Sequence, residues 1–424
     1  MFAQRKKRGA AQTYLILGGA SSFFFSLIVT VNLIYQQQVA HLNPLQLVLV
    51  GTVLETSAFL TQVPTGVLAD VYSRRLAIIT GTFLIGAGFF LEGLIPHFAT
   101  ILLAQVIWGV GAVMIDGADS AWIADEVGDE RVGALFVRAS QVGQIAGLIG
   151  IPISVALASI RLNIPIMAGG ALYWALGLFL IAAMPEQGFK PAPREGRSSW
   201  RAMAATTRDG ARLIRVRPIL LTFLGITVLY AMFSEGYDRL WIAHLLTDFR
   251  FPTLGGFKPV VWFGVIAVID SLLCIAAMEL VRRRLDTTNH RMVARALFVF
   301  NALLCASVIC FGLAGNFFLA LAANWLAGAF RAVRGPVLRA WQTQNIDPQV
   351  RATVLSIDGQ ADAFGQIAGG PALGAIGTVV SLRAALAVAG AVLAPALLLF
   401  VRAGRQSAAA PAPAEEEAAV SAEM

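Results

Sequence analysis

Charged residues stand in pairs inside long apolar runs of this chain, where they are candidates for binding protons or ions. Asp116 and Asp119 lie three residues apart in one run, and Arg331 and Arg334 lie three apart in another. Residues three apart share a face of a helix, so each pair would present two like charges together. Charges in an apolar environment are costly unless they are paired or hydrated. An acidic pair facing a basic pair would form a gate that a proton, or an anionic group on a solute, could open.

Three further acidic residues stand in apolar runs, namely Glu235, Asp238 and Asp270. Arginines opposite Asp116 and Asp119 would stabilise the charged carboxylates there and oppose proton binding. We therefore keep these three residues as alternative proton carriers. The competing interpretation is that the buried charges form structural salt bridges.

A third charged stretch, "GVLADVYSRR" at residues 66–75, joins two apolar runs. Asp70, at the membrane surface, can accept hydrogen bonds from the free N–H groups that open a neighbouring helix. Arg74 or Arg75 can pair with a carboxylate at the end of a nearby apolar run. The segment "ADEVGDER" offers two such carboxylates, Asp125 and Glu126.

The composition places these charges in a membrane. Of the 424 residues, 57% are hydrophobic and 13% are charged, and the mean hydropathy is +0.72. A soluble domain carries about 25% charged residues. Runs such as 76–95 and 382–401 are long enough to cross a bilayer as helices, and they are continuous rather than alternating. The sequence therefore predicts an all-α membrane protein.

Turn residues and charges divide the apolar runs into twelve expected transmembrane helices. Their approximate ranges are 14–36, 45–70, 76–95, 99–124, 133–160, 164–184, 217–243, 258–281, 293–314, 316–341, 351–380 and 382–402. The expected domains are 1–185 for a first six-helix half, 186–216 for a cytoplasmic linker with an amphipathic helix, 217–405 for a second half and 406–424 for a disordered tail.

Most of the 32 Lys and Arg residues fall in segments that share one side of this topology. The positive-inside rule then places both termini in the cytoplasm and the chain in the cytoplasmic membrane. Because topology accounts for the net charge of +7, no nucleic-acid partner is needed. We expect a monomer whose partners are lipid, protons and a small solute, with no cofactor, metal site or catalytic residues.

The two halves repeat each other in sequence. The stretches 131–152 and 351–371 both open with arginine and share "GQIAG", at matching places in the fifth and eleventh expected helices. Gly109 and Trp122 upstream of the first recur as Gly328 and Trp341 upstream of the second. This pattern predicts two six-helix halves related by a pseudo-twofold axis, an arrangement typical of transporters.

The stretch 66–75 resembles the signature of the major facilitator superfamily, Gly-x-x-x-Asp-(Arg/Lys)-x-Gly-Arg-(Arg/Lys). The matching residues are Gly66, Asp70, Arg74 and Arg75. Val71 replaces the usual basic residue and Ser73 the usual glycine, which weakens the tight turn but keeps the charge pattern. The twelve-helix layout with a long central segment resembles the same family, so the resemblance covers nearly the whole chain.

The resemblance implies an inner gate and a central cavity. In the gate, Gly66 would let the second helix approach another backbone closely, Asp70 would cap the eleventh helix near Arg351, and Arg74 or Arg75 would bind Asp125. The fifth and eighth helices would pack in the same way, with Arg138 and Glu279 as a pair between the halves; snorkelling of both side chains is the alternative. The cavity, lined by helices one, four, seven and ten, would place Asp116 opposite Arg334.

Within the superfamily, the chain looks most like prokaryotic exporters of drugs and metabolites. We expect a secondary active transporter that exports a small amphipathic solute in exchange for protons. An uptake permease or facilitator is the alternative within the family. An integral-membrane enzyme, a channel or a transport-dead sensor is the alternative of another class. An ATP-driven pump would need a Gly-x-x-x-x-Gly-Lys-(Ser/Thr) loop, and no lysine of this sequence stands in one.

Overall fold

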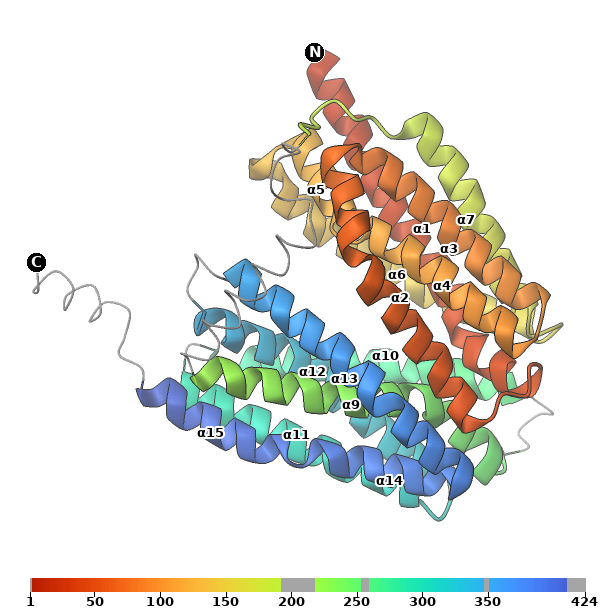
Figure 1. Cartoon of the computed structure of the whole chain (residues 1–424), viewed down its shortest axis with the longest axis vertical. Helices are drawn as coiled ribbons and strands as arrows, with labels where there is room; N and C mark the ends of the chain where they lie inside the picture. The colour runs from red at the N-terminus through yellow and green to blue at the C-terminus, as the bar shows by residue number, and fades with distance from the viewer. Residues whose placement is uncertain (1, 192–217, 253–258, 288, 347–350, 410–424) are drawn as a thin grey trace, which may run out of the picture.

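The computed structural model describes residues 2–191, 218–252, 259–287, 289–346 and 351–409, and all regular elements within these ranges are helices. The N-terminal helix group consists of α1 (Phe2–Gln38), α2 (Pro44–Val71), α3 (Arg74–Leu94), α4 (Phe98–Ile115), α5 (Ala118–Val127), α6 (Asp129–Ala158) and α7 (Ile164–Ala183). The C-terminal helix group consists of α9 (Pro218–Asp248), α10 (Pro259–Arg284), α11 (His290–Leu313), α12 (Phe317–Gln344), α13 (Arg351–Val379), α14 (Leu382–Leu393) and α15 (Ala396–Ala409). The two groups are drawn in Figure 1.

Several helices begin where a polar side chain caps their free N–H groups. Asn43 accepts from the backbone N–H of Gln46, whose side chain in turn accepts from the Asn43 backbone, and Pro44 opens α2. Ser73 caps α3 and Ser381 caps α14 in the same way, each by accepting a backbone N–H three residues on. These caps satisfy donors that the first turn of a helix leaves without partners. The Asn and Ser residues at these positions therefore set where α2, α3 and α14 begin.

Ten helical segments of the described residues are long and apolar enough to cross a membrane. α4 with α5 counts as one of these segments, and so does α14 with most of α15. α12 and α13 are 28 and 29 residues long but carry more polar and charged residues along their length. The expectation of an all-α membrane protein is thus confirmed.

Two expected spans are broken. The fourth is interrupted at Gly117, whose φ of 76° lies in the left-handed region that favours glycine, so α4 ends at Ile115 and α5 begins at Ala118. The twelfth is interrupted at Ala394 and Pro395, between α14 and α15. Proline has no N–H to continue the helical hydrogen bonds. Hydropathy alone does not show either break.

The packing order of one group recurs in the other. α1 packs along α6 and α3 along α4, as α9 packs along α13 and α11 along α12. A Cβ at Gly109 in α4 would meet Leu54 of α2 at 2.9 Å, and one at Gly328 in α12 would meet Asp270 of α10 at 2.2 Å. The matched glycines therefore lie at matching helix crossings.

The two helix groups touch at one end of the molecule and diverge towards the other (Figure 1). We call the first the closed end; there α1 and α9 end and α2 begins. The backbone N–H of Leu45 donates to Oγ1 of Thr378 across the groups (2.9 Å). At the opposite end, the open end, Gly66 of α2 has no atom within 4 Å of where a Cβ would stand.

The helix ends lie close to the expected domain boundaries. α7 ends at Ala183 and α9 begins at Pro218. α15 continues to Ala409, so the C-terminal helix extends beyond residue 405. The expected amphipathic linker helix and residues 410–424 lie outside the described residues.

Candidate functional site

Arg331 of α12 and Asp238 of α9 form an ion pair with two hydrogen bonds. Nη1 donates to Oδ1 (2.5 Å) and Nη2 to Oδ2 (2.7 Å), while Nε donates to the hydroxyl of Tyr230 (3.2 Å). α9 contacts helices of both groups, so it lies between them. The Asp238 side chain is 46% exposed, and a carboxylate so exposed within a membrane helix needs water. The pair therefore includes a carboxylate that is accessible to water.

Arg334 lies one turn further along α12 and is buried, with 4% of its surface exposed. Its guanidinium stands 3.9 Å from the centre of the Tyr230 ring, a cation–π contact that replaces part of its hydration. Nε and Nη2 of Arg334 have no hydrogen-bond partner among the described residues, and no described carboxylate forms an ion pair with it. This arginine is thus a buried cation with free donors.

Asp116 and Asp119 do not form the expected acidic face opposite these arginines. Asp116 is exposed at the C-terminus of α4, and Asp119 follows the break in the first turn of α5. The helix is interrupted at Gly117 between them, although the two carboxyl groups still interact electrostatically. Arg331 instead takes its carboxylate from α9 of its own group. The predicted pairing of Asp116 with Arg334 is absent from this conformation.

Asp119 lines a pocket of about 500 Å³ between α1, α5 and α6. Tyr14, Ser140 and Gln144 contribute polar groups to its wall. The pocket thus combines one carboxylate with hydroxyl and amide groups, which suits a polar part of a solute.

Glu235 and Arg239 form a second ion pair on α9, and this pair lies against the backbone of α2. Oε1 of Glu235 lies 3.2 Å from Nε of Arg239, and both side chains are largely buried. A Cβ at Gly51 of α2 would come within 1.7 Å of that oxygen and 2.4 Å of that nitrogen. Glu55, one turn along α2, interacts electrostatically with both residues. A charged cluster therefore joins the two groups, with a glycine making room for it.

Asp270, the remaining candidate proton carrier, faces α12. Its Oδ2 accepts a hydrogen bond from the Cys274 thiol (3.8 Å), and its Oδ1 lies against the backbone at Gly328. No ion pair of Asp270 occurs among the described residues. It therefore contributes a half-buried carboxylate within the C-terminal group.

The side chains of the signature stretch, residues 66–75, form their contacts within the N-terminal group. Arg74 forms an ion pair with Asp125, donates to the carbonyl of Ala121 (3.0 Å) and lies 3.6 Å from Asp70. Asp70 is 63% exposed and Gly66 has open space around it. The expected close approach at Gly66 and the expected cap on α13 are therefore absent from this conformation, which is open at that end.

Sequence reasoning missed Glu186, which follows α7. Its carboxylate accepts from the Ser73 hydroxyl (2.7 Å) and from the backbone N–H of Arg75 (2.9 Å). The Arg75 guanidinium donates instead to the carbonyl of Ile181 (2.6 Å). The Glu126 carboxylate accepts hydrogen bonds from the backbone N–H groups of Gln187 and Gly188, the two residues after Glu186. The sequence feature that could have indicated these contacts is an acidic residue directly after an apolar run.

Arg138 and Glu279 are not paired in this conformation. Glu279 binds Arg282 (2.7 Å) and Arg283 (2.5 Å) on its own helix, and Arg138 is exposed. α6 and α10 touch near the closed end, where a Cβ at Gly264 would lie 2.5 Å from Val155. The Arg138–Glu279 pair stays a prediction for a conformation closed at the opposite end.

A buried polar cluster around Glu92 of α3 was also missed. Its Oε1 accepts from the amides of Asn32 (2.9 Å) and Gln36 (2.7 Å), and its Oε2 from Gln105 (3.0 Å). Glu92 is fully buried and has no ion-pair partner among the described residues. Amides at positions 32 and 36, one turn apart in an apolar run, were a signal for such a cluster. Within the described ranges, no three His, Cys, Asp or Glu residues gather as a metal site.

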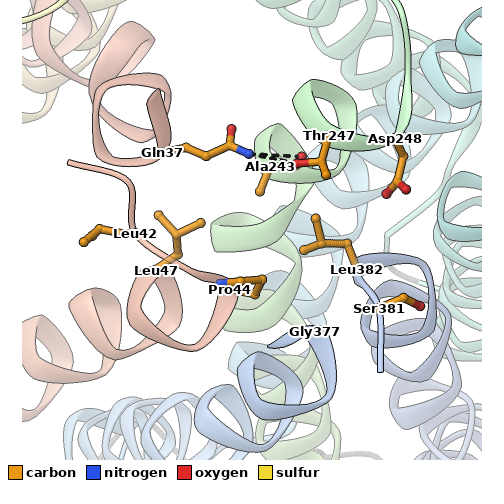
Figure 2. Close-up of a pocket in the computed structure, with 10 residues that line it drawn as sticks. All are labelled: Gln37, Leu42, Pro44, Leu47, Ala243, Thr247, Asp248, Gly377, Ser381 and Leu382. Carbon is orange, nitrogen blue, oxygen red and sulfur yellow. Dashed lines mark hydrogen bonds between the residues drawn. The ribbon is translucent and has the colours of Figure 1, made fainter. Parts of the chain in front are cut away.

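The closed end contains a pocket of about 370 Å³ between the groups, shown in Figure 2. Leu42, Pro44 and Leu47 line one side of it. Across it, the Gln37 amide donates to the Thr247 hydroxyl (3.0 Å). The pocket therefore lies where contacts of the two groups hold this end together.

Comparison with known proteins agrees with this architecture. The model of the Major Facilitator Superfamily matches residues 14–299. A curated relative, the uncharacterized MFS-type transporter YxaM of Bacillus subtilis (strain 168), is 27% identical over 136 residues. That match covers 32% of this chain and 34% of the relative, so it spans about a third of each.

Solved structures share the fold at low sequence identity. The nucleoside transporter NupG aligns with a TM-score of 0.73 and 14% identity over 93% of this chain and 98% of that chain. A peptide transporter POT in complex with sulfate aligns with a TM-score of 0.71 and 13% identity over 95% and 99% of the two chains. A bacterial homolog of the human lysosomal transporter Spinster, inward-facing and unoccupied, aligns at 0.70 and 13% over 95% and 97%. With its helical membrane fold, its signature stretch and the match over residues 14–299, this chain belongs to the Major Facilitator Superfamily of transporters.

Proposed function

We propose that this transporter moves a small amphipathic solute across the cytoplasmic membrane by alternating access, coupled to protons. The observation that carries the proposal is the asymmetry of the two ends. α2 meets α9 and α13 at the closed end through the Glu235–Arg239 pair and Thr378, whereas Gly66 of the same helix has open space. A transporter that alternates must exchange these two arrangements.

The proposed topology has twelve spans, with α12 and α13 added to the ten apolar segments. The recurring packing order and the matched glycines support two halves related by a pseudo-twofold axis. The distribution of Lys and Arg supports cytoplasmic termini, so that the open end faces the cytoplasm. In the opposite conformation, Gly66, Asp70 and Arg138 would make the contacts between halves that they lack here.

The proposed solute site lies between the groups, beside Arg331 and Arg334. The free donors of Arg334 suit an anionic or strongly polar group, and the Tyr230 ring suits an apolar one. The pocket at Asp119 would face the solute from the N-terminal group. Glu235 is our first choice as proton carrier, because its neutralisation would weaken the charged cluster under α2.

Export is the proposed direction, and uptake is the alternative. The structural relatives include a nucleoside transporter and peptide transporters, so nucleosides and dipeptides belong in the test beside amphipathic drugs. The experiment is transport into proteoliposomes under an imposed pH gradient, with each compound class offered on either side. Gradient-driven accumulation of one class supports the proposal, and its absence for all classes contradicts it.

The same assay tests the residues. Glu235→Gln, Asp238→Asn, Asp270→Asn, Asp116→Asn and Asp119→Asn are compared one by one. The neutral variant of the true carrier loses accumulation but keeps solute exchange, because only the proton step is removed. If all five still accumulate solute, the proton site lies elsewhere. Asp70→Asn tests the gate: transport at the parental rate would remove Asp70 from it.

A further inference from the structure

A groove of about 790 Å³ lies on the C-terminal group, between α11 and α15. It runs near the open end, where α11 begins and α15 ends. The two helices approach closely at its base, since a Cβ at Gly404 would lie 2.9 Å from that of Ala294. The groove is thus formed by two packed helices, not by a loop.

Three arginines line the groove, namely Arg291, Arg295 and Arg405. Arg291 and Arg295 stand one turn apart on α11, and Arg405 reaches the groove from α15. All three are exposed, and no carboxylate of the described residues forms an ion pair with them. Three cations that have no ion pair within the described part of the chain therefore converge on one groove and favour an anion there.

The remainder of the wall is apolar. Phe298, Val299, Phe400 and Val401 line it. Further from the arginines, Leu303 of α11 and Leu398 of α15 are also exposed. In a membrane protein, an exposed apolar face of this kind meets lipid chains. The groove therefore has a basic end and an apolar end, in the same order as a lipid's headgroup and chains.

We propose that this groove binds an anionic phospholipid, with its phosphate held by the three arginines and an acyl chain along Val299 and Val401. Basic pockets between helices at the cytoplasmic membrane surface are suited to anionic headgroups. A free phosphate would use the arginines alone and leave the apolar wall without a role. The Phe400 ring also lies 5.9 Å from the Arg334 guanidinium, so a bound chain would pack against a ring that contacts the solute site.

The test measures lipid binding to the purified full-length protein in detergent, by native mass spectrometry and by the shift in Tm on adding lipid. The probes are phosphatidylglycerol, cardiolipin, phosphatidylcholine and inorganic phosphate. We expect the two anionic lipids to bind and raise Tm, and the other two probes to have little effect. The variant Arg291→Gln/Arg295→Gln/Arg405→Gln should bind anionic lipid at least about tenfold more weakly.

The matched control is Arg131→Gln/Arg284→Gln/Arg402→Gln, which removes the same charge from exposed arginines outside the groove that have no ion pair among the described residues. It should bind anionic lipid within about twofold of the parent, because the groove is intact. Val401→Trp fills the apolar wall and should weaken lipid binding while the arginines remain. If both triple variants lost anionic-lipid binding equally, general surface charge would explain the binding and the proposal would be overturned. Equal binding of phosphatidylcholine, or an equal shift with inorganic phosphate, would overturn it as well.

Discussion

At the scale of single residues, Glu92 shows how a buried carboxyl group is held by neutral donors. It accepts three hydrogen bonds from amides of α1 and α4. Gln105, one of the donors, also accepts from the Trp108 indole (2.8 Å) and cannot turn its amide without losing that bond. The cluster therefore requires that both side-chain oxygens of residue 92 accept hydrogen bonds.

We predict that Glu92→Gln destabilises the protein by about 1–3 kcal/mol, because its new NH₂ group faces the donor of Gln105. Glu92→Leu should cost more, since it removes the acceptor of three buried hydrogen bonds and leaves the amides of Asn32 and Gln105 without one. Thermal unfolding in detergent measures both effects. Glu279→Gln is the control, because Glu279 pairs with exposed arginines and such pairs contribute little. Equal Tm values for Glu92→Leu and the parent would show that the cluster does not stabilise the fold.

At the scale of elements, the crossing of α2 over α9 rests on Gly51. A methyl group there would overlap the Glu235–Arg239 pair, so the ends of these side chains must shift and their contact with α2 changes. We predict that Gly51→Ala weakens the closed end by about 1–3 kcal/mol. The measurements are Tm and the labelling rate of a cysteine introduced at Thr247, which should rise.

Gly66→Ala is the matched control for this crossing, because Gly66 stands on the same helix with no neighbour within 4 Å. It should leave Tm and the labelling rate unchanged in this conformation. Equal labelling in Gly51→Ala and Gly66→Ala would mean that the crossing at Gly51 does not hold the closed end. Reduced transport in Gly66→Ala alone would indicate that α2 packs closely at Gly66 in the opposite conformation.

At the scale of the whole molecule, alternating access requires the closed end to open. We predict that a short thiol cross-linker between Gln37→Cys and Thr247→Cys, in a background without Cys274, Cys305 and Cys310, stops transport. The link joins α1 to α9 across the two groups, so it prevents their separation. Transport is measured in proteoliposomes before and after cross-linking and should return when the link is reduced.

The control pair for this experiment is Thr222→Cys with Gln406→Cys. Thr222 and Gln406 are hydrogen-bonded within the C-terminal group (3.0 Å), so their link spans no moving interface. It should form and leave transport intact. Transport that continues after full cross-linking of Gln37→Cys to Thr247→Cys would contradict alternating access at this end.

Much of the fold could be predicted from local features of the sequence. Apolar runs located the helices, and the pattern of Gly66, Asp70, Arg74 and Arg75 indicated the family. The contact of Arg74 with Asp125 was expected because both stand at helix ends near the same surface. The site was harder to predict from the sequence, because a spacing of three at Asp116 and Asp119 implies a shared helix face only if the helix is unbroken.

The sequence by itself determined that this chain is a helical membrane protein of a known family, since length, hydropathy and a short signature are properties of neighbouring residues. Tertiary structure alone decided which charges meet. Arg331 binds Asp238, Arg334 is left with free donors instead of pairing with Asp116, and the amides around Glu92 come from two other helices. Such contacts depend on how each helix is rotated and how closely it approaches its neighbours. Rotation and approach result from the packing of the whole bundle, and no single segment specifies them.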